Sequence, residues 1–173
     1  SLCIVGFIMK LGFIGTGNIT VAVVNGICGS KISFKKILIS PKNKSKALKL
    51  SKKFKKVSIA KTNQEIVDKC NWIFLAVTPK VGEKIIPKLK FRYNQKIISF
   101  ISTIKLAQLK KFIKKKVKIV RAIPLPPISI GKGPVPICPA DKQVKSFFDK
   151  IGTTIEIKSE KLSNNFWSMS GMM

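Results

Sequence analysis

The hydrophobic positions of this chain form short apolar runs that alternate with longer stretches in which apolar residues recur every three or four positions. Short runs are typical of buried strands, and the periodic stretches are typical of surface helices. The run at 71–77 is continuously apolar after Asn71, as expected for a strand buried on both faces. The predicted strands are 11–14, 34–40, 57–60, 71–77, 96–101, 118–122, 135–138 and 153–157. The predicted helices are 18–28, 44–55, one around 65–68, 81–89, 105–114 and 141–150.

This alternation of strands and helices predicts a parallel sheet joined by crossover helices. We therefore expect an α/β fold, Rossmann-like and doubly wound, with a mostly parallel sheet whose edge is extended by the last strands. The segment 123–127 contains three prolines and is predicted to be stiff and extended after the strand at 118–122. From Lys161 onward the pattern turns helical again, which predicts the start of a C-terminal helix.

A glycine-containing turn at 15–20, Gly-Thr-Gly-Asn-Ile-Thr, lies between the first predicted strand and the first predicted helix. Such a turn leaves backbone N–H groups at a helix N-terminus, where the helix dipole favours a phosphate. The third position of the dinucleotide fingerprint is Thr20 instead of Gly or Ala, so an ordinary strand-to-helix turn is the alternative. The surrounding strand and helix alternation favours a dinucleotide.

The end of the second predicted strand carries Ser40, Lys42, Asn43 and Lys44. Proteins that hold NAD usually place an acidic residue there, to accept hydrogen bonds from the ribose hydroxyls. A carboxylate would repel a 2′-phosphate, whereas these residues would attract one, so the sequence favours NADP(H) over NAD(H). The alternative is that Lys42 and Lys44 are two more solvated lysines.

Charge is the most unusual feature of the composition, since 34 Lys and Arg residues stand against 7 Asp and Glu residues, a formal net charge of +27. Such a field attracts polyanions. The lysines are spread over predicted helix faces and turns, Arg occurs only at 92 and 121, and stacking platforms of aromatic residues are lacking. We therefore expect a solvated Lys-rich surface that binds nucleic acid only non-specifically, with a basic nucleic-acid-binding module as an alternative.

The residue inventory excludes several kinds of chemistry. The chain has no histidine, which removes Ser-His-Asp, Cys-His and His-metal sites. The carboxylates show no metal-ligand spacing, and the cysteines at 3, 28, 70 and 138 lie in apolar segments without a Cys-x-x-Cys pair. Buried reduced thiols indicate a reducing, cytoplasmic setting. We expect no metal and no membrane anchor, and cofactor chemistry is what is left.

The pattern also predicts how the chain is organised. We interpret residues 1–9 as an N-terminal segment outside the domain, in which Met9 is the natural start and the residues before it are extra, and residues 10–158 as one NAD(P)-binding domain. Residues 159–173 are then the start of a truncated helical domain, entered at Ser168–Gly171. The 173 residues, 45% of them hydrophobic, can bury a substantial core.

Five short motifs, in this order and spacing, resemble the N-terminal domain of the delta-1-pyrroline-5-carboxylate reductase family. They read GFIGTGNI at 12–19, ISPKN at 39–43, NQEIVD at 63–68, LAVTP at 75–79 and VRAIP at 120–124. The resemblance covers about residues 10 to 160. It implies hydride transfer from NAD(P)H to the cyclic imine pyrroline-5-carboxylate, giving proline. It also implies a following helical domain that forms a homodimer, or a larger assembly, and much of the small-molecule substrate site.

The resemblance implies cofactor-binding roles and assigns no catalytic residue or metal ligand. Asn63 would approach the adenosine ribose. Three groups of residues would bind the rest of the cofactor: Gly15, Thr16, Gly17, Asn18 and Ile19 at the pyrophosphate, Ser40, Lys42 and Asn43 at the adenosine phosphate, and Ala76, Val77 and Thr78 on the path to the nicotinamide.

Two segments depart from the family pattern. Thr78 stands where the family usually has Lys, with Lys80 two residues later, and Ile123-Pro124-Leu125 replaces the usual Met-Pro-Asn. Leu125 cannot donate or accept a hydrogen bond as Asn would. A related reductase of another small imine or carbonyl compound is therefore an open alternative.

Overall fold

The computed structural model describes residues 9–161, and within them eight strands form one sheet. The strand order is β3-β2-β1-β4-β5-β6-β7-β8, with β1 to β6 parallel, β7 antiparallel to β6, and β8 parallel to β7. This confirms the Rossmann-like, mostly parallel sheet with an extended edge. The strands are β1 (Lys10–Ile14), β2 (Lys36–Ile39), β3 (Val57–Ile59), β4 (Trp72–Leu75), β5 (Lys96–Ser99), β6 (Lys118–Ala122), β7 (Pro134–Cys138) and β8 (Thr153–Glu156).

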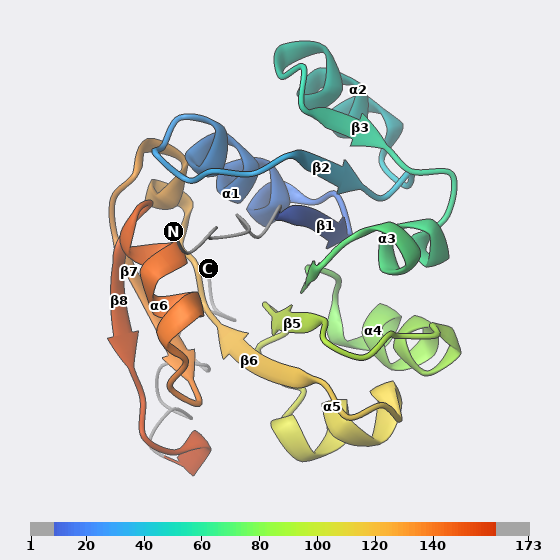
Figure 1. Cartoon of the computed structure of the whole chain (residues 1–173), viewed down its shortest axis with the longest axis vertical. Coiled ribbons are helices and arrows are strands. Elements are labelled where there is room, and N and C mark those ends of the chain that lie inside the picture. Colours follow the sequence, from blue (N-terminus) through green and yellow to red (C-terminus); the bar gives the residue numbers. More distant parts are fainter. Residues whose placement is uncertain (1–8, 162–173) are drawn as a thin grey trace, which may run out of the picture.

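Helices connect the strands on both faces of the sheet. Figure 1 shows α2 beside β3 at one end of the sheet and α6 beside β7 and β8 at the other. The α-helices are α1 (Asn18–Cys28), α2 (Lys44–Lys53), α3 (Asn63–Lys69), α4 (Pro79–Ile85), α5 (Leu106–Ile113) and α6 (Lys142–Asp149). Two 3₁₀ helices, η1 (Ile86–Lys88) and η2 (Pro126–Ile130), complete the elements of the described part.

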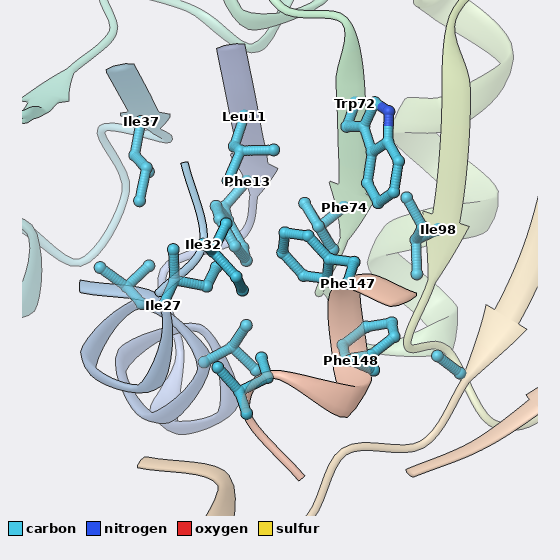
Figure 2. Packing of buried hydrophobic residues seen from close by; sticks show 14 of the residues in the cluster. Leu11, Phe13, Ile27, Ile32, Ile37, Trp72, Phe74, Ile98, Phe147 and Phe148 are labelled. Atoms are coloured by element: carbon cyan, nitrogen blue, oxygen red, sulfur yellow. The ribbon is translucent and has the colours of Figure 1, made fainter. Parts of the chain in front are cut away.

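The sheet separates two hydrophobic cores because successive strand residues point to opposite faces. One core packs the sheet against α1, α2, α6 and η2, and the other packs it against α3, η1 and α5. In the first core, Phe147 of α6 lies 5.1 Å from Trp72 and 5.7 Å from Phe74 between ring centroids (Figure 2). Phe74 also stacks on Phe13 at 4.5 Å. These aromatic contacts join the central strands to the extension of the sheet.

Proline explains where the structure differs from the predicted elements. The segment 123–127 was predicted to be extended, and this is wrong for its second half, since Pro126 and Pro127 begin η2. The fixed φ of proline suits the first turn of a helix as well as an extended chain, and the missing N–H costs nothing there. Similarly, the helix predicted at 81–89 begins earlier, at Pro79, and changes to 3₁₀ geometry at η1, which contains Pro87.

Two predictions fall on residues outside the described part. They are the extra N-terminal residues, apart from Met9, and the domain entry at Ser168–Gly171. The proposed boundaries at 10–158 and 159–173 stay predictions.

A largely buried ion pair connects β5 to α6. Lys96 Nζ lies 2.7 Å and 2.8 Å from the two carboxylate oxygens of Asp141, and it also donates to Gln143 Oε1 at 2.7 Å. Asp141 caps α6 by accepting from the N–H groups of Gln143 and Val144. Burial by itself would raise the pKa of Asp141, but the hydrogen bonds from Lys96 and the cap amides outweigh it and hold that pKa below its ordinary value.

This lowered pKa predicts how stability depends on pH. Asp141 binds its proton more weakly in the folded chain, so its contribution is complete above the unfolded pKa of about 3.9 and is lost as pH falls through the lower folded pKa. Since the chain has no histidine, we expect stability to be nearly flat from about pH 5 to 7 and to fall below about pH 4. Urea unfolding across this range would check it, and Asp141→Asn should flatten the acid branch. An unchanged fall in stability at low pH in that variant would show that Asp141 does not cause it.

Candidate functional site

The glycine turn follows β1 at the centre of the sheet, and its backbone conformation requires Gly15. Gly15 has φ +104°, and a Cβ built there would lie 2.2 Å from the carbonyl oxygen of Ala76 and 2.9 Å from Val77 Cγ1. Only a residue without a side chain tolerates both conditions. The ends of β1 and β4 therefore come together at Gly15, which places Ala76 and Val77 beside the turn.

Side-chain hydroxyls hold this turn from behind. Ser40 Oγ accepts from the N–H of Gly15 at 2.9 Å and lies 3.2 Å from Thr16 Oγ1, which donates to the Ser40 carbonyl at 2.8 Å. Thr20 Oγ1 donates to the Gly15 carbonyl at 2.7 Å. Thr16, Thr20 and Ser40 are all buried, with Ser40 only 2% exposed. The hydroxyl of Ser40 thus faces the turn, and Thr20 stabilises it from the third position of the fingerprint.

After Gly15 and Thr16, which these hydrogen bonds hold, the turn opens toward solvent at Gly17. A Cβ at Gly17 would meet nothing within 4 Å, and its φ of −91° is ordinary. Gly17 is the N-cap of α1, with no side-chain cap and no acidic residue in the first turn. Asn18 is exposed and Ile19 half-buried. The positive end of the α1 dipole is therefore accessible from the carboxyl edge of the sheet.

A crevice lies beside this helix N-terminus, with a cavity volume of about 370 Å³. Leu125 is one of its apolar lining residues, and Ser102 is a polar one. In doubly wound sheets, ligands bind in crevices at the carboxyl ends of the strands, near the point where the strand order reverses, which here lies between β1 and β4. The lining residues are Asn18, Ile19, Ala22, Phe100, Ser102, Ile123, Pro124, Leu125 and Pro126.

The remaining predicted cofactor residues lie at the same edge, because parallel strands end together there. Lys42 and Asn43 follow β2 and are exposed, and the Asn43 side chain accepts from Lys46 N at 3.5 Å as the N-cap of α2. Asn63 begins α3 after β3, and its Oδ1 is buried with no hydrogen-bond partner among the described residues. Thr78, after β4, is exposed as the N-cap of α4.

Sequence reasoning missed two residues that shape the site, Thr20 and Gly26. Thr20 had only a negative signal, as the wrong residue for the fingerprint, although a hydroxyl in the first turn of α1 could have suggested the bond to Gly15. Gly26 was also missed. A Cβ at Gly26 would lie 2.3 Å from the Ile128 carbonyl oxygen, so α1 and η2 approach through this glycine. That contact holds the Pro126 end of the crevice against α1.

The described residues also bear on metal binding, thiol chemistry and membrane insertion. Residues 9–161 contain no group of three or more His, Cys, Asp or Glu that could hold a metal ion. Burial raises the pKa of Cys28 and Cys138, and that of Cys70 to about 11. Thiols with raised pKa values are poor nucleophiles. Within the same part of the chain, every helix is too short or too polar to cross a membrane.

A doubly wound, mostly parallel sheet with an open glycine turn after β1 is typical of Rossmann-like domains, the class in which dinucleotide-binding proteins are found. Residues 10–105, more than half of the 173-residue chain, match the family described as "NADP oxidoreductase coenzyme F420-dependent". The chain belongs to this family.

Similarity to single proteins points in the same direction and confirms the resemblance to pyrroline-5-carboxylate reductases. Pyrroline-5-carboxylate reductase 3 of Danio rerio is 29% identical over 130 residues, which are 73% of this chain and 44% of the relative. The enzyme of Escherichia coli K12 is 27% identical over 133 residues, covering 75% of this chain and 49% of that enzyme. The chain thus spans about half the length of the curated relatives it matches.

Solved structures share the fold. The pyrroline-5-carboxylate reductase of Coxiella burnetii matches 94% of this chain and 63% of its own, with a TM-score of 0.81 and 22% identity. A Plasmodium falciparum pyrroline carboxylate reductase described with NADP bound matches with a TM-score of 0.77 and 21% identity, over 95% of this chain and 64% of its own.

Proposed function

We propose that residues 10–158 are the NADP(H)-binding domain of a reductase of the pyrroline-5-carboxylate type, which reduces that cyclic imine to proline. The observation that carries the proposal is the open N-terminus of α1 at Gly17, next to the crevice at the centre of the sheet. The family to which the chain belongs, the named relatives and the five ordered motifs also support this proposal. In this proposal, the residues from 159 onward begin a second domain that completes the substrate site and the dimer.

The chain's own residues fit the phosphates of a dinucleotide. The main-chain N–H groups of Gly17, Asn18 and Ile19 would hold the pyrophosphate, since no side chain occupies the space above Gly17. Gly15, Thr16 and Ser40 would act indirectly, because their bonds hold the turn that presents those amides. We thus assign Ser40 to the support of the turn and leave direct contact with the adenosine phosphate to Lys42 and Asn43.

At the other end of the cofactor, the crevice would receive the nicotinamide ring. When bound, the reduced ring supplies the hydride for the substrate. Ile19, Ile123 and Leu125 provide an apolar wall that would exclude water from it, and Ala76, Val77 and Thr78 would line the approach from β4. Residues 1–173 contain no histidine, so any proton donor that they supply for the product is another kind of group.

Titration with NADPH and with NADH, followed by the fluorescence of the reduced nicotinamide, tests the proposal on the 173-residue chain. We expect saturable binding of NADPH and weaker binding of NADH. Absence of binding to either nucleotide would overturn the cofactor assignment.

A substitution at Lys42 tests the preference for NADPH separately. Lys42→Asp should weaken NADPH binding about tenfold, a cost of about 1.4 kcal/mol, and leave NADH binding within about twofold, because only NADPH carries the 2′-phosphate. Lys55→Asp is the matched control, since it makes the same charge change at an exposed lysine beyond the other end of α2. Equal losses in the two variants would show that only the overall charge of the chain matters.

A related reductase of another small imine or carbonyl compound is the second candidate. It is favoured by Leu125, which lines the crevice where the resembling family places Asn, and by Thr78, where that family places Lys. A chain extended through the second domain, assayed with pyrroline-5-carboxylate and with other cyclic imines, would separate the two candidates. Turnover of the other imines alone would favour the second.

A further inference from the structure

A buried arginine lies next to the crevice and connects it to the end of the domain. Arg121, in β6, is only 2% exposed, and its Nη2 donates to the main-chain carbonyl of Ser102. Its Nη1 donates to Glu160 Oε1 at 3.0 Å. Ser102 belongs to the loop between β5 and α5 and lines the crevice. Glu160 lies after β8, where the chain leaves the sheet.

The same carboxylate oxygen also holds the start of α5. Glu160 Oε1 accepts from the N–H of Leu106, the first residue of α5, at 2.7 Å. Lys105, the N-cap of that helix, makes no side-chain cap bond. A negative charge at this position satisfies an otherwise unused amide and complements the helix dipole. Glu160 thus joins the exit of the domain to both β6 and α5.

These bonds hold the loop at 100–105 from two sides. Its Ser102 carbonyl is bonded to Arg121, and the Leu106 amide that follows the loop is bonded to Glu160. A guanidinium buried to this degree needs a counter-charge, and Glu160 supplies one. The crevice wall formed by Phe100 and Ser102 therefore depends on a carboxylate that lies more than 50 positions later in the sequence.

We propose that Glu160 and Arg121 are positioning residues for the nicotinamide half of the cofactor, so that the segment leaving the domain sets the shape of the crevice. The inference rests on the proposed function. Neither residue lines the crevice itself, and both act through Ser102 and the start of α5. The adenosine half, at Lys42 and Asn43, lies beyond β2 on the other side of β1 and is independent of them.

Calorimetric titration of the 173-residue chain with two ligands tests this role. One ligand is NADPH, and the other is 2′-phospho-ADP-ribose, which lacks the nicotinamide. For Glu160→Ala we expect NADPH binding to weaken about threefold to tenfold and binding of the fragment to stay within about twofold, a range typical of residues that act through neighbours. Glu160→Gln keeps an acceptor for Leu106 and removes the charge opposite Arg121, so it should weaken NADPH binding less, in the same direction.

Glu156→Gln is the matched control, because it makes the same chemical change at an exposed position in β8. Thermal unfolding of each variant shows whether it is folded, and Glu160→Gln carries the test if Glu160→Ala does not fold. Equal losses for both ligands, or no loss for either, would overturn the positioning role and leave the cofactor assignment standing. A parent chain that binds neither ligand would overturn the cofactor assignment itself, and the positioning role with it.

Discussion

Replacing Gly15 with alanine is expected to lower the free energy of unfolding by about 2–4 kcal/mol and to remove measurable cofactor binding. The backbone at Gly15 has φ +104°, a region that residues with a Cβ rarely adopt. The added methyl group would also lie 2.2 Å from the Ala76 carbonyl oxygen and 2.7 Å from its carbon. Both are backbone atoms at the end of β4, so they cannot move without displacing the strand.

Relief by movement of Gly15 itself would break the bonds that hold the turn. Its N–H donates to Ser40 Oγ and its carbonyl accepts from Thr20 Oγ1, so a shift of Gly15 disrupts both. The N–H groups at the start of α1 would then lose their arrangement. Chemical denaturation measures the stability loss, and NADPH titration measures the binding loss.

Gly131→Ala separates the two causes of strain. Gly131 has φ +73°, but a Cβ there would meet nothing within 4 Å. We expect this variant to cost only about 1–2 kcal/mol, from the left-handed backbone alone, and to leave NADPH binding unchanged. If the two alanine variants lost the same stability, the contact with Ala76 would carry no energetic weight.

The sheet was largely predictable because its central strands are buried on both faces. Such strands are continuously apolar, and their alternation with amphipathic helices leaves few topologies. The ends of elements were less predictable. The apolar run at 71–77 extends past β4, which ends at Leu75, because side-chain polarity does not show where strand pairing ends. The prolines of η1 and η2 were ambiguous because their fixed φ suits both a helical turn and an extended chain.

The site divides in a similar way between local and long-range features. Gly15 and Gly17 were identifiable because a strand, a glycine turn and a helix start follow one another in sequence. The inward direction of the Ser40 hydroxyl was not, since it depends on how β1 and β2 pair. The bond between Arg121 and Glu160 joins residues that are distant in sequence and was also beyond sequence reasoning. Polar residues at strand ends are thus found from sequence more easily than their partners.

Replacing Gly17 with alanine should leave the stability of the fold nearly unchanged, unlike the same change at Gly15, two positions earlier. Its φ of −91° suits alanine, and the added methyl group would meet nothing within 4 Å. Alanine is a poorer N-cap than glycine, but it also restricts the unfolded chain, so we expect the free energy of unfolding to change by less than about 1 kcal/mol. The folded domain should therefore be retained.

Cofactor binding by the Gly17→Ala variant should nevertheless weaken at least about thirtyfold, or about 2 kcal/mol, because the methyl group occupies the space through which the pyrophosphate would reach the main-chain amides of α1. NADPH titration measures this loss beside the unfolding curve of the same sample. Gly29→Ala, at the C-cap of the same helix, is the matched control and should bind NADPH as the parent does. A folded Gly17→Ala chain with parental affinity would mean that a pyrophosphate is not held at the N-terminus of α1, since a methyl group at that position can only be tolerated where no phosphate approaches.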